Sequence, residues 1–435
     1  MRREKKFNRS LLLLAIMSIM LFAMTITASA AQAVTGIKQT DAHEGSVDIE
    51  WNMNPNQYYR VLYSTSKNGK YYRINNYTSS YDTADGDAYI YNLNAGATYY
   101  VKVESYIRDD NWDYHRVAVS APCQVVTTPK DVEYKKIKQT AGTAKSVTVK
   151  WASVPGATGY KVTLEGDTSL KKKFVTGTKV TMPASAGLDY KIKVQAYRKC
   201  SATGYVAMAD ESIKSGIYAA PLNPQNIASK DNISWDPTSS NKITIDWDRN
   251  SYYSSNYSAK WPDGYQMQII SIDGKKRLYT TKPLSSYGPV TINTPSVRKA
   301  INNKGFRVKM RTYVKTDSGL TIWSKWTAAK VIVPTAKIRG AKALSGSAAK
   351  IYWSKVSNAK YYVVYYNSNT EATNGGIWKK KKVSANTTSF TIRGLKYYRD
   401  FGFYVVPSVK VGKKTYTPVD AKKNAYKTYI KKVYY

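Results

Sequence analysis

Apolar and polar residues alternate in short runs along most of the chain, and four of these runs end at a tryptophan. The runs SVDIEW, SVTVKW, KITIDW and AKIYW end at Trp51, Trp151, Trp247 and Trp353, about 100 residues apart. Alternation with a period of two puts every second side chain on one face of a strand. Each run therefore predicts a strand with one buried face, and the recurrence predicts four repeats.

A second alternating run follows each tryptophan. Its core-facing side chains are expected to be Tyr59, Val61 and Tyr63; Tyr160, Val162 and Leu164; Tyr265, Met267 and Ile269; and Tyr362, Val364 and Tyr366. The residues between them are expected to be polar and to face water. A later strand in each repeat opens with Tyr99, Tyr190, Phe306 or Phe401, and Leu93, Gly96 and Tyr99 have the spacing of a tyrosine corner. No amphipathic helix of useful length is predicted, so the pattern indicates an all-β chain of sandwiches.

The first 30 residues have a different pattern. A basic start precedes a 16-residue apolar run, Leu11 to Ile26, which is shorter than the roughly 20 residues of a membrane span. Small residues follow, so residues 1–30 are predicted to be a signal peptide cut after Ala30 or Ala33. The alternative is an uncleaved signal anchor. The mature chain is expected to be secreted or held at the cell surface.

The repeats resemble fibronectin type III modules in the version common in secreted proteins of Gram-positive bacteria. Repeats two and four share W-x-x-V-x-x-A-x-x-Y-x-V, from Trp151 to Val162 and from Trp353 to Val364. The resemblance implies four tandem immunoglobulin-like β-sandwiches after the signal peptide. Proline-marked strand ends predict module 1 at 31–128, module 2 at 129–221, module 3 at 222–334 and module 4 at 335–435.

Charge is distributed unevenly. The chain has 67 Lys and Arg against 29 Asp and Glu, a net charge of +38. Module 1 has 8 basic and 11 acidic residues, whereas module 4 has 21 basic and 3 acidic residues. Module 4 is therefore predicted to bind a polyanion through Trp378, Lys379, Lys380, Lys381, Lys382, Lys413, Lys414, Lys422, Lys423, Lys431 and Lys432. The expected partner is an anionic cell-wall or matrix polymer, such as teichoic acid or an acidic polysaccharide, and nucleic acid is less favoured. The alternative is that the lysines only form a solvated surface.

Two loops carry unusual aromatic content. An insertion after Trp247 contains Tyr252, Tyr253, Tyr257 and Trp261 among serines and asparagines, a composition that resembles an antibody paratope. A loop of module 1 contains Trp112 and Tyr114. Both are expected to bind carbohydrate or a surface protein, and the alternative for the insertion is that it folds back over its own module.

A third aromatic feature lies in module 3. Arg307, Lys309 and Arg311 alternate on one strand, and Trp323 and Trp326 follow. The pattern is similar to the Trp-Ser-x-Trp-Ser box of cytokine-receptor fibronectin modules, although Thr327 replaces the last serine. It predicts a structural ladder of stacked cations and indoles.

Side chains that carry chemistry are few. His43 and His115 lie in predicted loops without a nucleophile motif, so no enzyme activity is predicted. Asp109, Asn111 and Asp113 match only part of a calcium loop, and no metal or cofactor is expected. Cys123 and Cys200 are expected to be two separate thiols, with a bridge between modules as the alternative. The predicted function is non-enzymatic extracellular binding or adhesion; the alternatives are an accessory part of a glycan-processing enzyme system and an extracellular nucleic-acid binder.

Overall fold

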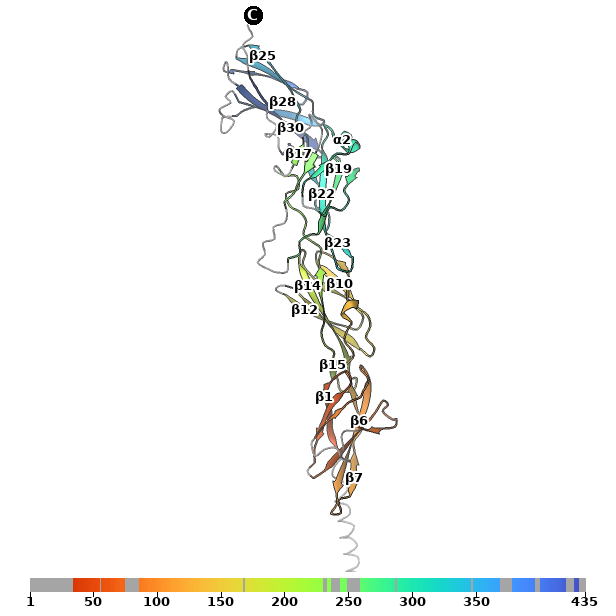
Figure 1. Ribbon diagram of the computed structural model, residues 1–435. Coiled ribbons are helices and arrows are strands. Elements are labelled where there is room, and N and C mark those ends of the chain that lie inside the picture. Colours follow the sequence, from red (N-terminus) through yellow and green to blue (C-terminus); the bar gives the residue numbers. More distant parts are fainter. Residues whose placement is uncertain are drawn as a thin grey trace, which may run out of the picture.

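The computed structural model describes residues 34–54, 56–74, 86–166, 169–229, 233–235, 243–248, 259–285, 288–345, 347–367, 378–395, 400–419 and 426–429. Within these residues, antiparallel strands form four three-stranded and four five-stranded sheets. One sheet of each kind encloses a separate hydrophobic core, and the four sandwiches follow one another in an elongated row (Figure 1). The predicted all-β sandwich fold is confirmed, whereas the predicted signal peptide lies outside the described residues.

The strands of modules 1 and 2 have the same order in space. In module 1 the sheets are β1 (Thr35–Ala42), β2 (Val47–Asn52) and β5 (Asp87–Ile90), and β4 (Tyr72–Arg73), β3 (Tyr58–Ser64), β6 (Thr98–Arg108), β7 (Tyr114–Val119) and β8 (Cys123–Val126). In module 2, after the 3-10 turn η1 (Tyr134–Lys136), they are β9 (Lys138–Gly142), β10 (Ser146–Lys150) and β13 (Lys179–Pro183), and β12 (Leu170–Val175), β11 (Gly159–Glu165), β14 (Asp189–Lys199), β15 (Val206–Met208) and β16 (Ser212–Tyr218).

Modules 3 and 4 repeat this order. In module 3 the sheets are β17 (Ile233–Trp235), β18 (Ile243–Ile245) and β21 (Val290–Ile292), and β20 (Arg277–Thr280), β19 (Gly264–Ser271), β22 (Phe306–Lys315), β23 (Thr321–Trp323) and β24 (Lys330–Ile332). In module 4 they are β25 (Ile338–Ser345), β26 (Ala348–Trp353) and β29 (Ser389–Arg393), and β28 (Lys379–Ser384), β27 (Ala359–Asn367), β30 (Asp400–Val411), β31 (Lys414–Tyr416) and β32 (Tyr426–Tyr429).

Module 3 also contains a helix that the sequence pattern did not predict. Helix α2 (Pro295–Ile301) begins with a proline and buries Val297 and Ile301 in the core. Its seven residues place only these two apolar side chains at helical spacing, so the period of 3.6 could not be recognised. The helix lies directly before β22, where modules 1 and 2 have a short turn before β6 and β14.

The predicted tryptophans form the centre of each core. Trp51, Trp151, Trp247 and Trp353 are all buried. Each indole contacts the first tyrosine of the following strand, with ring centroids 5.4, 5.3, 5.1 and 5.6 Å apart in modules 1 to 4. In modules 2 and 4, the tyrosine hydroxyl also accepts a hydrogen bond from the valine of the shared motif, at 2.9 Å from Val154 N and 2.8 Å from Val356 N. The spacing of the motif therefore recurs because the tyrosine hydroxyl bonds the valine N–H and so holds the turn between the tryptophan and the next strand.

The tyrosine corner predicted in module 1 is present. The hydroxyl of Tyr99 accepts a hydrogen bond of 2.9 Å from the main-chain N–H of Asn94. Tyr190 of module 2 makes the equivalent contact with Ser185 N at 2.7 Å. Phe306 and Phe401 occupy this position in modules 3 and 4 and have no hydroxyl, so only their packing is retained.

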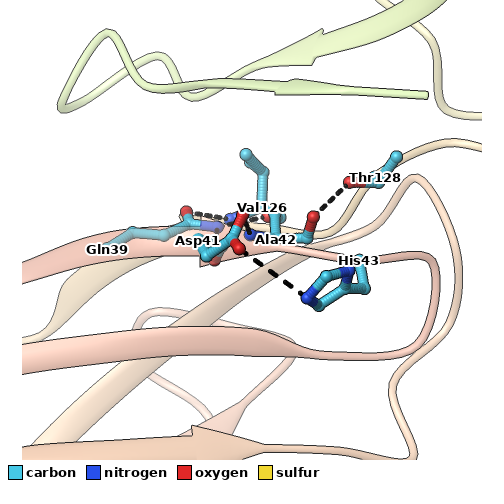
Figure 2. Close-up of polar contacts among 6 residues, drawn as sticks. All are labelled: Gln39, Asp41, Ala42, His43, Val126 and Thr128. Carbon is cyan, nitrogen blue, oxygen red and sulfur yellow. Dashed lines mark hydrogen bonds and ion pairs between the residues drawn. The ribbon is translucent and has the colours of Figure 1, made fainter. Parts of the chain in front are cut away.

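A buried glutamine ties the first strand of a module to its last strand. In module 1, Nε2 of Gln39 donates to Val126 O at 2.7 Å, and its Oε1 accepts from Val126 N at 2.9 Å (Figure 2). Gln139 makes the same pair of bonds with Tyr218 in module 2, at 2.6 and 2.9 Å. The sequence signal was the tetrapeptide IKQT, which begins at Ile37 and again at Ile137. Figure 2 also shows that His43 lies near the carboxylate of Asp41 at the surface, as expected of a loop histidine.

Each junction between modules is packed. Between modules 1 and 2, the guanidinium of Arg198 donates to Thr98 Oγ1 at 2.7 Å, and within module 2 it also donates to Gly156 O. Between modules 2 and 3, Ala220, Val314 and Ile322 form a small buried cluster. Between modules 3 and 4, Nδ2 of Asn303 donates to Lys355 O at 2.7 Å. These contacts join each module directly to the next.

Candidate functional site

The lysine run of module 4 lies on β28, an edge strand of the five-stranded sheet. All four lysines, 379 to 382, are exposed. Lys381 is paired with the buried Val364, whereas Lys380 and Lys382 are paired with Tyr365 and Val363. Residues paired directly across two antiparallel strands share a face. Lys380 and Lys382 therefore lie on the outward face of the sheet, and Lys379 and Lys381 lie on its other side.

The outward face beside these two lysines is aromatic. Tyr365 of β27 and Tyr404 of β30 stack with ring centroids 4.7 Å apart and planes 7° apart. The indole of Trp378 is 5.1 Å from the ring of Tyr404. Lys382 Nζ lies 4.0 Å from the ring centroid of Tyr361. We call this surface the module 4 aromatic face; its members are Trp378, Lys380, Lys382, Tyr361, Tyr365 and Tyr404.

The module 4 aromatic face corrects one sequence-based expectation. The positions between the core-facing residues of β27 were expected to be polar, but they are Tyr361, Val363 and Tyr365, which are half-buried. In module 2 the matching positions are polar, with Lys161 half-buried and Thr163 buried. The signal in the sequence was the unbroken run YYVVYY. Its odd and its even positions are both apolar or aromatic, so it predicts a strand with two apolar faces.

The electrostatic setting of this face is strongly positive. Module 4 has only three acidic residues, Glu371, Asp400 and Asp420, so its lysines have few carboxylates to pair with. Burial, followed by the neighbouring Tyr365 hydroxyl, raises the pKa of Tyr404, so this ring carries no charge at neutral pH. The face therefore combines uncharged rings with ammonium groups that remain available to an anion.

The other predicted polyanion-binding residues are not part of this face. Lys413 and Lys414 are exposed at the turn between β30 and β31. This turn follows Val411, seven residues along β30 from Tyr404, a distance of roughly 23 Å at the rise of an antiparallel strand. Lys422, Lys423, Lys431 and Lys432 lie outside the described residues.

The aromatic loop of module 1 is a structured hairpin tip. It connects β6 to β7 and exposes 69% of Trp112, the largest exposed fraction among the large apolar side chains of the described residues. The guanidinium of Arg108 lies 3.8 Å from the centroid of the Trp112 indole and 5.6 Å from the ring centroid of Tyr58. Tyr58 in turn meets Tyr114 edge-on at 5.0 Å. The structure thus brings the two predicted residues together with Arg108 and Tyr58. Tyr58 was missed because it lies on β3, far from the loop along the chain, and Arg108 was missed because nothing in the sequence marks it as the cation that stacks on the indole.

The aromatic insertion of module 3 is described only at its end. Tyr252, Tyr253 and Tyr257 lie outside the described residues, and Trp261 is 47% exposed. The preceding residue, Lys260, donates its main-chain N–H to Gly187 O of module 2 at 2.9 Å. Its ammonium also lies 4.9 Å from the Tyr218 ring centroid. The described end of the insertion therefore contributes to the junction between modules 2 and 3.

The predicted ladder of module 3 is present around Arg311. Its guanidinium lies 4.0 Å from the Trp323 ring centroid and 4.6 Å from that of Trp326. Lys309 Nζ is 5.0 Å from Trp326. Arg307 is not part of the ladder, because its Nε donates to the main-chain oxygen of Ile272 at 2.8 Å.

Ser324 and Thr327 complete the ladder by hydrogen bonding to β22. Their hydroxyls accept main-chain N–H groups of Thr312 and Met310, both at 2.9 Å. Thr327 therefore does here what a serine hydroxyl would do, which explains why the substitution in the motif is tolerated.

The remaining reactive side chains do not gather into a site. Cys123 and Cys200 are both free, and burial raises the pKa of the Cys123 thiol. His115 Nε2 lies 2.7 Å from Asp109 Oδ2 at the hairpin tip, and this contact lowers the pKa of Asp109. Within the described ranges, no group of three His, Cys, Asp or Glu side chains is placed to hold a metal ion. No helix in the same ranges is both long and apolar enough to cross a membrane.

No family model matches the chain, and no curated protein matches it. Two solved structures are similar over much of their length. The FN1–FN3 domains of chicken CNTN1 are 13% identical, with 90% of this chain and 99% of that one covered at a TM-score of 0.20. A segment of two fibronectin type III domains from chicken tenascin is 16% identical, with 42% and 98% covered at a TM-score of 0.24. The sheets and tryptophan cores themselves show an all-β chain of tandem sandwiches.

Proposed function

We propose that this chain is an exported, non-enzymatic binding protein of the cell surface or matrix. Module 4 attaches it to an anionic polymer, and module 1 presents the hairpin tip at the other end of the row (Figure 1). The observation that carries the proposal is the module 4 aromatic face, where Lys380 and Lys382 stand beside outward-facing rings that the core does not require.

The chemistry of this face suits a long anionic polymer. Lysine ammonium groups are hydrated point charges that pair with phosphate or carboxylate without a fixed geometry. Each exposed pair contributes little and is screened by salt, so firm attachment needs many repeats of the ligand. A polymer of teichoic acid or acidic polysaccharide supplies those repeats, and the rings offer contact area for its backbone.

Binding is a better fit than catalysis for physical reasons. Electrostatic catalysis needs a site from which water is excluded. The lysines of β28 are exposed on the surface of a sheet, where water screens every charge. Such a surface holds a ligand but does little to stabilise a transition state.

A second candidate function is binding of extracellular nucleic acid. It is favoured by one observation, the interleaving of Lys382 with Tyr361 and of Lys380 with the stacked pair Tyr365 and Tyr404. Single strands are bound by this combination of cations and aromatic platforms. Teichoic acid has no bases to stack, so the two candidates differ in how much the rings contribute.

The test compares charge removal on two equivalent edge strands. The variant Lys380→Gln/Lys382→Gln changes β28, and the control Lys172→Gln/Lys173→Gln removes the same charge from β12, the matching strand of module 2. Retention of the full chain is measured on isolated Gram-positive cell walls, on walls stripped of teichoic acid, and on single-stranded DNA, across a salt series. We expect the β28 variant to lower the slope of log affinity against log salt by about 1.4 to 1.8, because each lost contact removes about 0.7 to 0.9.

Two results would contradict the proposal. Equal losses in the two variants would mean that net charge, and not this face, retains the protein. Retention that does not change with salt would exclude a polyanion altogether. Stronger retention on single-stranded DNA than on walls, lost in Tyr365→Ala, would favour the second candidate. Export is checked separately by finding the chain in the medium with its N-terminus at residue 31 or 34.

A further inference from the structure

The hairpin tip of module 1 places an exposed indole in a conformation that costs energy. Trp112 has a φ of +71°, in the left-handed region that bulky residues avoid. The same residue exposes most of its ring to water. A strained backbone and an exposed large aromatic at one residue are together unfavourable for folding, and such combinations concentrate at binding and active sites.

The surrounding loop holds the indole in this position. Asp109 Oδ1 accepts hydrogen bonds from the main-chain N–H groups of Asn111 and Asp113, at 3.0 and 2.9 Å. The loop is closed by Asp109 N to Asp113 O, at 3.0 Å, and by Trp112 N to Asp109 O, also at 3.0 Å. Arg108 covers part of the indole at 3.8 Å. The ring is therefore fixed before any ligand arrives, and little conformational entropy remains to be lost on binding.

The charge of the tip determines which ligands it can accept. Three of the five loop residues between β6 and β7 are aspartates, and Asp110 and Asp113 are exposed. The whole of module 1 is also acidic, with 11 acidic against 8 basic residues. An anionic polymer would be repelled here, in contrast to module 4. The exposed carboxylates instead favour a ligand that donates many hydrogen bonds and carries no negative charge.

We infer that the β6–β7 tip binds an uncharged carbohydrate. The apolar C–H face of a pyranose ring packs on the indole of Trp112, and hydroxyl groups of the sugar donate to Asp110 and Asp113. Arg108 lies against the indole, and Tyr58 in turn contacts Arg108. This inference rests on the display role proposed above for module 1, and it names the class of ligand for that role.

The experiment measures depletion of the full chain from solution by microcrystalline cellulose, chitin and insoluble α-glucan. The buffer contains about 0.5 M NaCl, where the Debye length of about 4 Å suppresses retention through module 4. We expect binding to at least one of these uncharged polymers, and a loss of about tenfold or more in Trp112→Ala, because the stacking contact is removed. Tyr134→Ala removes another exposed aromatic ring, in the turn η1 of module 2, and is the control, with no change expected.

Two further variants separate contact from loop geometry. Asp110→Asn/Asp113→Asn removes the charged acceptors and is expected to weaken binding by about threefold, with the melting temperature unchanged. Asp109→Ala keeps Trp112 but removes the bonds that fix the loop, and it is expected to weaken binding by about threefold as well.

The outcomes separate this inference from the proposed function. No binding to any of the three polymers, or equal binding by Trp112→Ala and the unchanged chain, overturns the inference while salt-sensitive retention on walls still supports module 4. Loss of binding to phosphatidylcholine vesicles in Trp112→Ala, without polysaccharide binding, overturns it in favour of a membrane contact. Loss of wall retention in the β28 variant has no bearing on the tip.

Discussion

Replacing Gly156 by alanine tests whether the row of modules is held stiff by its junctions. Gly156 of module 2 has a φ of +75°, and a Cβ added there would lie 2.0 Å from the main-chain oxygen of Gly96 in module 1. Non-bonded carbon and oxygen atoms need more than 3 Å, so the two backbones must move apart by about 1 Å. Arg198 joins the same two segments, and its 2.7 Å bond to Thr98 would then stretch beyond hydrogen-bond length.

The energetic cost has a local part and a junction part. Placing alanine in the left-handed region costs about 1 to 2 kcal/mol. Losing a hydrogen bond from a charged donor costs about 1.5 to 3 kcal/mol more, which shifts the equilibrium between closed and open junctions roughly 10- to 150-fold. Gly204→Ala is the matched control, because Gly204 has a φ of +78° and nothing within 4 Å of its added Cβ. It carries the local cost without the junction cost.

Small-angle scattering and calorimetry measure the two parts separately. Both variants should lower the melting temperature of module 2 by about 4 to 8 °C for each kcal/mol of local cost. Only Gly156→Ala should reduce the radius of gyration of the full chain, because only that variant lets the row bend between modules 1 and 2. Identical scattering from the two variants would show that the Gly96–Gly156 contact does not set the angle, and the stiff row would have to be abandoned.

Three other predictions follow from contacts within single modules. Gln139→Leu should destabilise module 2 by about 2 to 3 kcal/mol, seen as faster hydrogen exchange in β16, because two bonds to Tyr218 are lost and its main-chain groups stay buried; Thr143→Ala, at the exposed turn, should change exchange in β16 little. Burial, and then the bond to Glu104, raises the pKa of Tyr106 to about 12, so the folded state holds this proton more tightly. Stability should therefore be complete below about pH 10 and fall as the pH rises toward 12, and denaturation of Tyr106→Phe should lack this fall. Arg311→Ala should lower the free energy of unfolding by about 2 kcal/mol, because two indole contacts and the bonds to Gln266 are lost. Arg307→Ala should lower it by less than about 1 kcal/mol. Equal losses of stability in calorimetry would refute the ladder.

The alternation of side chains was enough to predict the sandwich cores. Trp151 and Tyr160, for example, are recognised from spacing alone because the period of two must match one buried face along an entire strand. Helix α2 was missed because seven residues are too few to show a period. The paired hydrogen bonds of Gln39 and Gln139 were missed because a polar residue in a strand is predicted to face outward unless its hydrogen-bond partners are known.

The candidate sites could be predicted only as far as they are local in sequence. The lysines of β28 and the loop at Trp112 are continuous segments with unusual composition, and both were found. Tyr404 and Tyr58 belong to their sites through strand pairing, since β30 pairs with β27 and β3 pairs with β6. Pairing partners far apart along the chain are set by the whole sheet, so no short pattern reveals them.

Lysines on an edge strand can also protect a sheet from pairing with another molecule, and this role is an alternative explanation for the lysines of the module 4 aromatic face. Charged edge strands prevent sheets from pairing with other molecules. β12 of module 2 has three consecutive lysines at the same edge, so protection of the edge accounts for lysines on both strands. Protection does not account for the neighbours, because the outward-facing side of β11 has the half-buried Lys161 and the buried Thr163, where β27 has the half-buried Tyr361, Val363 and Tyr365. Outward tyrosines add apolar surface to an edge that the lysines are keeping soluble. Module 2 has one outward ring pair beside its lysines, Phe174 and Tyr197, with centroids 5.9 Å apart. Module 4 has the larger aromatic surface of Trp378, Tyr361, Tyr365 and Tyr404, and it is this extent, and not the number of lysines, that makes module 4 the better candidate for attachment.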